Sequence, residues 1–240
     1  MNDYRSIIYK TYNIKFNKVI ANISLTDIES MHKHYSVKVL PYLKKFNKEI
    51  KILELGCGAG YLLDYLKLNG FTNLCGIDIS AEQLELAREK KLNVFEYDVT
   101  EFLQQNNKQW DVIFAFDFIE HFTKDELLKM TSLINKSLAE DGILFIRTPN
   151  GEGLFPNGII YGDLTHQTIF NSNSLAQLLS VSGFSSFIFF ENAPVNKNIK
   201  GVVRFALWKI IKLFLNIIKI VEVGNPQKIW TREFYCVAKK

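Results

Sequence analysis

The fold is decided at residues 52–63, where the sequence reads ILELGCGAGYLL. An apolar run of strand length passes directly into three glycines, Gly56, Gly58 and Gly60, and then into a second apolar stretch. Glycine tolerates positive φ and has no Cβ, so a ligand can approach the main chain closely at such a turn. A tight strand-to-helix turn without a ligand needs the same glycines. This stretch alone therefore predicts a strand–turn–helix unit and leaves its function open.

Short apolar runs alternate with amphipathic stretches along the rest of the chain. The runs of strand length cover residues 50–55, 73–79, 92–97, 112–116, 143–147 and 184–190. Two intervening helices are predicted to begin with capping boxes, Ser80 with Gln83 and Thr123 with Glu126. Strict alternation predicts parallel strands with helices on both faces, because each crossover is right-handed. The expected fold class is α/β, with a doubly wound, Rossmann-like sheet.

Composition and charge exclude several classes of protein. Of the 240 residues, 48% are hydrophobic and 22% charged, too apolar for a disordered chain. A formal net charge of +4 does not indicate a nucleic-acid binder. Three scattered cysteines, Cys57, Cys75 and Cys236, suit neither a disulfide framework nor a zinc site, and the polar N-terminus lacks the apolar run of a signal peptide. We therefore expect a cytoplasmic protein that binds no nucleic acid.

No repeat or linker divides the chain, so we expect one main domain at residues 47–240. Residues 1–46 form an expected N-terminal helical extension, whose helical spacing is set by Ile7, Ile8, Ile14, Ile20, Val37, Leu40 and Leu43. His32 and His34 lie in a polar part of this extension and are expected to be solvated.

Two acidic residues flank the glycines in the sequence, Glu54 before them and Asp78 after them. In doubly wound sheets, ligands bind beyond the carboxyl ends of the strands. Asp78 ends the next strand about 20 residues after the glycines, where an acid can accept hydrogen bonds from ribose hydroxyls. The spacing Gly-x-Gly-x-Gly differs from the Gly-x-Gly-x-x-Gly that seats a pyrophosphate, and Glu54 suits a cationic group instead. A nucleoside ligand carrying an amine is predicted.

Together, residues 54–60, Asp78, Tyr97-Asp98-Val99 and the run WDVIFAFDFIEH at 110–121 resemble the ordered motifs of class I S-adenosylmethionine-dependent methyltransferases. The resemblance implies S-adenosylmethionine as cofactor and S-adenosylhomocysteine as product. It also implies seven strands in the order 3-2-1-4-5-7-6, with an antiparallel last strand at residues 231–238. The cofactor-binding residues that it implies are Glu54, Gly56, Cys57, Gly58, Gly60, Asp78, Ile79, Asp98, Val99, Asp117 and His121. Two of these have another interpretation: Asp98 as a turn former, and His121 as a surface histidine at a helix start.

A long connection at residues 149–170 is predicted to lie over the site, because long loops in compact domains are usually functional. Its segment YGDLTHQTIF at 161–170 resembles one found in the ubiquinone-type and sugar O-methyltransferase branches. His166 has a suitable pKa for a general base, and Asp163 is placed to orient it or to bind an acceptor hydroxyl. Alternatively, both residues only pin the loop. Tyr35, Tyr161 and His166 are the expected substrate contacts, and no metal site is expected because His121, Asp163 and His166 lack ligand spacing.

Residues 202–221 form the most apolar stretch of the chain. Four cations, Arg204, Lys209, Lys212 and Lys219, interrupt it and gather on one side of a helix. A cation at the bilayer centre costs about 3 kcal/mol on insertion scales, which argues against a membrane span. An amphipathic helix at 201–222 is predicted, with three open alternatives: binding in the plane of an anionic membrane, packing on the sheet, or contact within a homodimer.

We therefore predict an enzyme that methylates an oxygen of a small molecule, with a sugar or cell-surface glycan precursor as acceptor. One alternative is a quinone-precursor O-methyltransferase at the inner membrane face. Another is a protein that binds S-adenosylmethionine without catalysis. Methylation of nucleic acid is disfavoured, because the loop after the fourth strand lacks an Asn/Asp-Pro-Pro-aromatic run.

Overall fold

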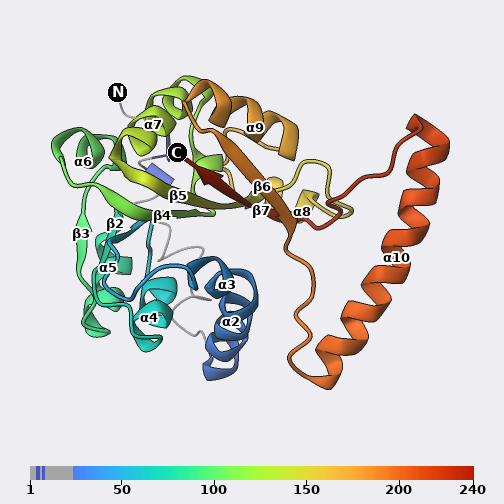
Figure 1. Ribbon diagram of the computed structural model, residues 1–240, viewed down its shortest axis with the longest axis horizontal. Coiled ribbons are helices and arrows are strands. Elements are labelled where there is room, and N and C mark those ends of the chain that lie inside the picture. The colour runs from blue at the N-terminus through green and yellow to red at the C-terminus, as the bar shows by residue number, and fades with distance from the viewer. Residues whose placement is uncertain (1–3, 6, 9–23) are drawn as a thin grey trace.

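One seven-stranded sheet organises the chain in the computed structural model, which describes residues 4, 5, 7, 8 and 24–240 (Figure 1). The strand order is β3-β2-β1-β4-β5-β7-β6. The strands are β1 Ile52–Leu55, β2 Leu74–Asp78, β3 Val94–Glu96, β4 Trp110–Phe116, β5 Leu138–Pro149, β6 Ser186–Glu191 and β7 Glu233–Lys239. Strands β1 to β5 pair in parallel, and β7 runs antiparallel to both β5 and β6. The predicted sheet order and antiparallel last strand are confirmed.

Helices cover both faces of the sheet, as the doubly wound prediction requires (Figure 1). They are α2 Leu25–Lys38, α3 Leu40–Leu43, α4 Tyr61–Leu68, α5 Ala81–Glu89, α6 Val99–Gln105, α7 Lys124–Ser137, α8 Asn157–Ile160, α9 Ser172–Val181 and α10 Ile199–Val223, with a 3₁₀ turn, η2, at Ile119–His121. Alternate side chains of β1 serve different layers: Leu53 packs in the cluster under α6, α7 and α9, and Ile52 in the cluster under α2, α3 and α4.

The strand register brings the carboxyl ends of β1, β2, β4 and β5 to one edge of the sheet. Leu55 of β1 lies beside Ile77 of β2 and Ala115 of β4, and Ala115 lies beside Ile146 of β5. The loops that follow these strands therefore meet at this carboxyl edge. All four β1 residues are buried, which is why the strand reads as a continuous apolar run around Glu54.

Only one of the two predicted capping boxes forms. The Thr123 side chain accepts from the main-chain N–H of Glu126, whose carboxylate accepts from the N–H of Thr123, at the start of α7. At α5 the prediction is wrong, since the Ser80 side chain makes no cap hydrogen bond. The N–H of Ser80 donates to Asp78 Oδ1 at 2.8 Å instead. The main-chain N–H of Ser80, which the Gln83 side chain would accept from in a capping box, is therefore already bonded to Asp78.

The two histidines of α2 are half-buried and have partners in the protein, which corrects the expectation that they are solvated. His34 Nε2 donates to Asn192 Oδ1, because the amide nitrogen of Asn192 is engaged with Glu233. His32 packs against the ring of Tyr65 at 5.1 Å between centroids, and its Nε2 is buried. The α2 face that carries them turns toward the protein because Tyr35 anchors it in the core. Ile14 and Ile20, also part of the predicted extension, lie outside the described residues.

Helix α10 stands beside the sheet, at the right of Figure 1, rather than on it. Asn198 caps its start by accepting from the N–H of Gly201, and Gly224 ends it at φ 81°. Its apolar side chains do not join the core clusters, so packing of this apolar face on the sheet, one of the three alternatives, is wrong. Among the described residues, no helix is long and apolar enough to cross a membrane.

Candidate active site

The glycine loop between β1 and α4 adopts a backbone that other residues tolerate poorly. Gly56, Gly58 and Gly60 have φ values of 67°, 49° and 72°. A Cβ at Gly56 would lie 2.6 Å from the ring of Phe118, which belongs to the loop after β4. The loops after β1 and β4 therefore touch at Gly56, whereas a Cβ at Gly58 would meet only the side-chain oxygen of Gln83, at 3.8 Å.

Glu54 offers a buried carboxylate beside this loop. Its side chain is 6% exposed, and its Oε2 has no hydrogen-bond partner among the described residues. Burial raises the pKa of Glu54 well above the usual value, and the positive charge of Arg147 only partly opposes this. An unmatched buried carboxylate is costly, so the position suits a ligand with a cationic group. The amino group of S-adenosylmethionine fits this requirement.

Asp78 is held by the main chain at the end of β2. Its Oδ2 accepts from the N–H of Gly58 and its Oδ1 from the N–H of Ser80, each at 2.8 Å. Burial raises the pKa of Asp78, and these main-chain donors work in the opposite direction. The carboxylate keeps further lone pairs for ribose hydroxyls. Ile79, which follows it, is half exposed at the same edge.

The remaining predicted cofactor residues occupy the adjoining loops. Asp98 is the N-cap of α6, accepting from the N–H groups of Thr100 and Glu101, so it has a structural role of its own. Val99 is buried behind it. Cys57 is buried in the glycine loop, and burial raises the pKa of its thiol. An adenine contact by Asp98 or Val99 stays a prediction.

Asp117 belongs to an ion pair that the sequence did not reveal, and its own side chain is 44% exposed. Its carboxylate binds the guanidinium of Arg147 on β5, with Nε donating to Oδ1 at 2.9 Å, and its φ is 48°. Burial is the largest single influence on the pKa of Arg147 and lowers it, but Asp117, Tyr235 and Tyr35 together outweigh burial and keep the pKa of the guanidinium raised. Their positions after β4 and on β5, which are parallel neighbours, were a possible signal. The pair fixes the loop after β4.

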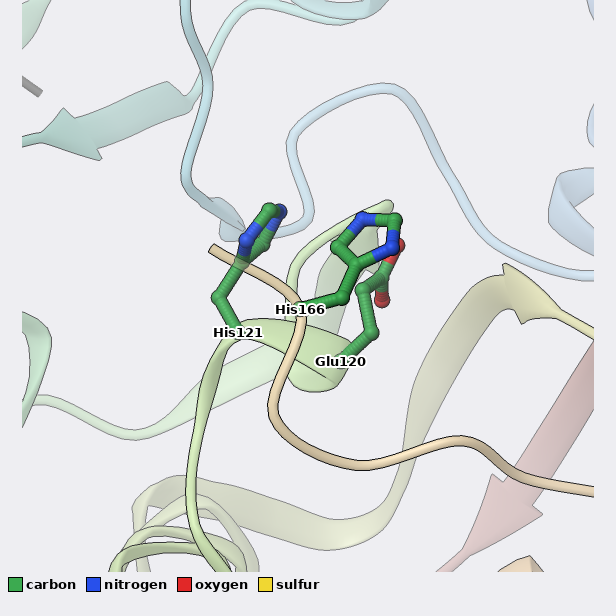
Figure 2. Close-up of side chains that lie close together, drawn as sticks. All are labelled: Glu120, His121 and His166. Atoms are coloured by element: carbon green, nitrogen blue, oxygen red, sulfur yellow. The ribbon is translucent and has the colours of Figure 1, made fainter. Parts of the chain in front are cut away.

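Three side chains converge on the acceptor side of the carboxyl edge: Glu120 and His121 from η2, and His166 from the 149–170 loop (Figure 2). The two imidazole rings are 4.9 Å apart between centroids. The carbonyl of Glu120 accepts from the N–H groups of Gln167 and Thr168, which ties the long loop to η2. Because Phe118 of the same segment packs on Gly56, we place this cluster next to the cofactor loop.

Hydrogen bonds orient both histidine rings and select the tautomer of His166. The Thr165 hydroxyl donates to Asp163 Oδ1 at 2.6 Å, and its oxygen lies 2.8 Å from His121 Nδ1. His166 Nδ1–H donates to the carbonyl of Ile160 at 3.1 Å, so its Nε2 is the basic nitrogen. The ring of His166 is thus oriented by a main-chain carbonyl, and Asp163 instead contacts Thr165. Burial lowers the pKa of His121, and nearby His166 lowers it further.

The same three side chains could hold a divalent cation, although the sequence predicted no metal site. One ligand atom from each of Glu120, His121 and His166 lies within 4.8 Å of the other two. Imidazole nitrogens with one carboxylate suit a borderline divalent ion. Burial raises the pKa of Glu120, and the charge of Asp117 adds to the effect, so a cation here would relieve an unfavourable carboxylate. Sequence spacing missed the group because Glu120, not Asp163, completes it.

The two tyrosines that were predicted to contact the substrate differ greatly in exposure. Tyr35 is buried, with its ring 5.5 Å from that of Tyr65, and burial raises its pKa. Tyr161 is 78% exposed on the long loop. Neither belongs to the cluster of Glu120, His121 and His166.

A cleft of about 790 Å³ opens where the long loop, α2, the start of β7 and the foot of α10 meet. Most of its charged side chains are basic: Lys33, Lys197, Lys200, Arg204 and Arg232, with Glu233 as the acid. Aromatic walls come from Phe155, Trp208 and Trp230. The cleft adjoins the carboxyl edge because Glu233 pairs with Pro149 of β5, and it suits an anionic ligand.

The sheet order and the residues at its carboxyl edge define a class I methyltransferase fold. Residues 28–186 match the family described as a methyltransferase domain, and the chain belongs to that family. S-adenosylmethionine is the cofactor of these enzymes. The buried Glu54 carboxylate fits its amino group, and the Asp78 carboxylate fits its ribose hydroxyls.

Curated relatives match over part of their length. The ubiquinone biosynthesis O-methyltransferase of Pelagibacter ubique is 32% identical over 108 residues, covering 43% of each chain. The cyclopropane-fatty-acyl-phospholipid synthase of Escherichia coli K12 is 28% identical over 126 residues, covering 46% of this chain and 32% of the synthase. The matches thus span less than half of these relatives.

Solved structures match over most of the chain. A SAM-dependent methyltransferase from Archaeoglobus fulgidus has a TM-score of 0.67 at 23% identity, covering 89% of this chain and 94% of that one. The magnesium protoporphyrin IX methyltransferase of Synechocystis PCC 6803, with bound SAM, has a TM-score of 0.62 at 16% identity, covering 100% and 98%. At these identities the likeness establishes the fold.

Proposed function

We propose that this protein transfers the methyl group of S-adenosylmethionine to a hydroxyl oxygen of a small molecule. The observation that carries the proposal is the position and tautomer of His166. Its Nε2 is basic and belongs to a cluster whose η2 segment touches the glycine loop. A hydroxyl acceptor gains nucleophilicity when its proton leaves, and a histidine serves as the base near neutral pH.

The chain's own residues divide the work between binding and proton transfer. Glu54 binds the amino group of the cofactor, and Asp78 binds its ribose hydroxyls. His166 Nε2 takes the proton from the hydroxyl of the acceptor molecule. When bound, the cofactor supplies a methyl group already activated by its sulfonium. In-line placement is then the main requirement, and it contributes a large part of the rate. Asp117 and Arg147 keep the intervening loop rigid.

A sugar or glycan precursor carrying phosphate is the proposed acceptor. The support is the basic cleft beside the long loop, where five cations face one acid. Sugars in biosynthesis are commonly carried on phosphates, which Arg and Lys bind well. A quinone precursor is the second candidate, favoured by the likeness to the Pelagibacter ubiquinone biosynthesis O-methyltransferase.

The N-terminal extension is proposed to cover this site. Arg5 forms a bidentate pair with Glu126 at 2.7 and 3.0 Å, and donates to the carbonyl of His121. Tyr4 contacts the side chain of Gln167 in the long loop. Both contacts involve the acceptor cluster or the long loop, and they support the proposal that the start of the chain covers the site.

Turnover of a His166→Ala variant tests the proposal. S-adenosylhomocysteine release should be measured with nucleotide sugars, glycosyl phosphates and dihydroxy-aromatic acids as acceptors. Loss of a general base should lower the rate about 10²- to 10⁴-fold. Cofactor affinity measured by calorimetry should not change, and a Leu164→Ala variant, at an exposed position of the same loop, is the control.

Full activity of His166→Ala across pH would eliminate it as the base. Cofactor binding without transfer to any acceptor class would favour the non-catalytic alternative. Activity that chelation abolishes and divalent cations restore would assign His166, with Glu120 and His121, to a metal instead.

A further inference from the structure

Helix α10 presents its apolar face to the outside of the molecule. Along the helix, the outer residues recur at intervals of three and four, which places them on one side. They are 51–84% exposed: Val203, Leu207, Ile210, Phe214, Ile217 and Val221. On the flanks of this strip, Ile211, Leu213, Ile218 and Ile220 are 44–64% exposed. Contiguous exposed apolar surface of this kind marks an interaction site.

The opposite side of α10 faces the protein through a polar row. Trp208 Nε1 and Lys212 Nζ both reach Glu191, at 3.5 and 2.9 Å, and Asn216 Oδ1 accepts from Trp230 Nε1 at 2.9 Å. These three residues are spaced by four and share one face. The row fixes which side of the helix points outward, and the extended segments at both ends hold it beside the sheet (Figure 1).

Charge identifies the occupant of this face. Exposed cations surround the first half of the apolar strip: Lys197, Lys200, Arg204 and Lys209. Within α10, Glu222 is the sole acid against five Lys and Arg residues. Two copies packed through this strip would bring cations together with few acids to match them. An anionic lipid surface satisfies both the apolar strip and its cations.

We propose that α10 docks this protein on an anionic membrane, lying in the plane of the lipid headgroups. The apolar strip enters the boundary between headgroups and acyl chains, and the flanking cations contact lipid phosphates. At 25 residues the helix is about 37 Å long, so it offers an extended contact line. The basic cleft lies on the side of α10 that faces the protein, where Trp208 lines it.

Vesicle co-sedimentation of the full chain tests the proposal. The probes are vesicles of phosphatidylcholine alone and of phosphatidylcholine with phosphatidylglycerol. The double variant Ile210→Asp/Phe214→Asp should lose binding by at least tenfold, and Lys200→Glu/Lys209→Glu should lose about tenfold on anionic vesicles only. The control Leu25→Asp/Leu128→Asp changes two exposed leucines of α2 and α7 equally and should bind as the parent does.

Light scattering on the same samples separates the alternatives. A monomeric parent that binds phosphatidylglycerol vesicles through α10 supports docking. The proposal is overturned if the parent fails to bind these vesicles. It is also overturned if the Ile210→Asp/Phe214→Asp variant binds them as well as the parent does. A dimer that Ile210→Asp/Phe214→Asp converts to a monomer, without vesicle binding, would assign the strip to a second copy instead.

Discussion

At the scale of single residues, the site is organised by charged side chains and by whether each has a partner. Asp117 and Arg147 neutralise each other in the fold. Glu54, buried close by, has one carboxylate oxygen without a partner among the described residues. An uncompensated buried carboxylate is unfavourable, so under the proposed function Glu54 lowers the stability of the ligand-free protein and gains a partner when the cationic amino group binds.

A Glu54→Gln variant should separate these two effects. The folded-state pKa of Glu54 is raised above its unfolded value, so its contribution to stability is present at acidic pH and is lost as pH rises through the folded-state pKa. The variant should therefore lose less stability with rising pH than the parent does. Its affinity for S-adenosylhomocysteine should fall about 10- to 100-fold, because a hydrogen bond to a charged group is lost.

Calorimetry and urea denaturation at several pH values give both quantities. Asp78→Asn serves as the comparison for Glu54→Gln, because the carboxylate of Asp78 already accepts from two main-chain donors. Equal cofactor affinity of Glu54→Gln and the parent would contradict the assignment of Glu54 to the amino group.

Sequence patterns identified chemistry-bearing residues better than their partners. Glu54 and Asp78 stood out because each has a fixed place relative to a strand end, and His166 because its imidazole lies in a long loop. Arg147 did not, since its partner Asp117 follows the neighbouring strand β4 and is 30 residues away in sequence. The same limit explains His34, whose partner Asn192 follows β6. Side-chain pairs between different strands depend on the strand register, which a single sequence does not reveal.

At the scale of elements, the two helix starts at Thr123 and Ser80 show how a neighbour overrides a local pattern. Both fit a capping box, yet Asp78 takes the N–H that Gln83 needs. At α7, Glu126 also receives Arg5, whose hydrogen bonds lower the pKa of Glu126 to about 2. The start of α7 is therefore stabilised both by its own capping box and by the ion pair between Glu126 and Arg5.

Replacing the two hydroxyls should give unequal results. Thr123→Ala removes an N-cap and should lower the free energy of unfolding by about 1 kcal/mol. Ser80→Ala removes a side chain that makes no cap hydrogen bond and should change it by less than about 0.5 kcal/mol. Chemical denaturation measures both. Equal losses would show that Ser80 caps α5 in solution.

The amphipathic pattern of α10 was visible in the sequence, but its direction was not. Periodicity predicts which side chains share a face and says nothing about which face meets the protein. The direction depends on Glu191 and Trp230, which bind Lys212 and Asn216. Those contacts come from β6 and the segment before β7.

At the scale of the whole molecule, Phe145 of β5 joins the layers. It is fully buried, and its ring lies 5.4–6.1 Å from five others: Tyr42, Phe114, Phe116, Phe190 and Tyr235. These rings come from α3, β4, β6 and β7. Aromatic pairs at such distances add to the energy of burial.

Phe145→Ala should lower the free energy of unfolding by about 3–5 kcal/mol, because it leaves a cavity at this junction. Phe145→Leu, which retains most of the volume, should lose distinctly less. Urea denaturation followed by fluorescence and by circular dichroism measures the loss. A small loss in the alanine variant would mean that the surrounding rings collapse into the space.

Sheet order was predictable at this scale because a doubly wound architecture and the ordered motifs constrain it together. Strand ends shifted by a few residues, most of all in β5, which begins at Leu138 rather than Ile143. Its start pairs with Trp110 across an irregularity in the register. Such local irregularities have no periodic signal, so apolar runs alone underestimate the strand.

The position of β7 between β5 and β6 has a consequence for synthesis on the ribosome. Both neighbours leave the exit tunnel before β7 does, so each exposes a strand edge that its partner cannot yet cover. Helix α10 emerges in the same interval, with its apolar strip uncovered. The nascent chain therefore passes through a stage with two open edges and an apolar helix, when chaperones or the membrane itself would protect it from aggregation.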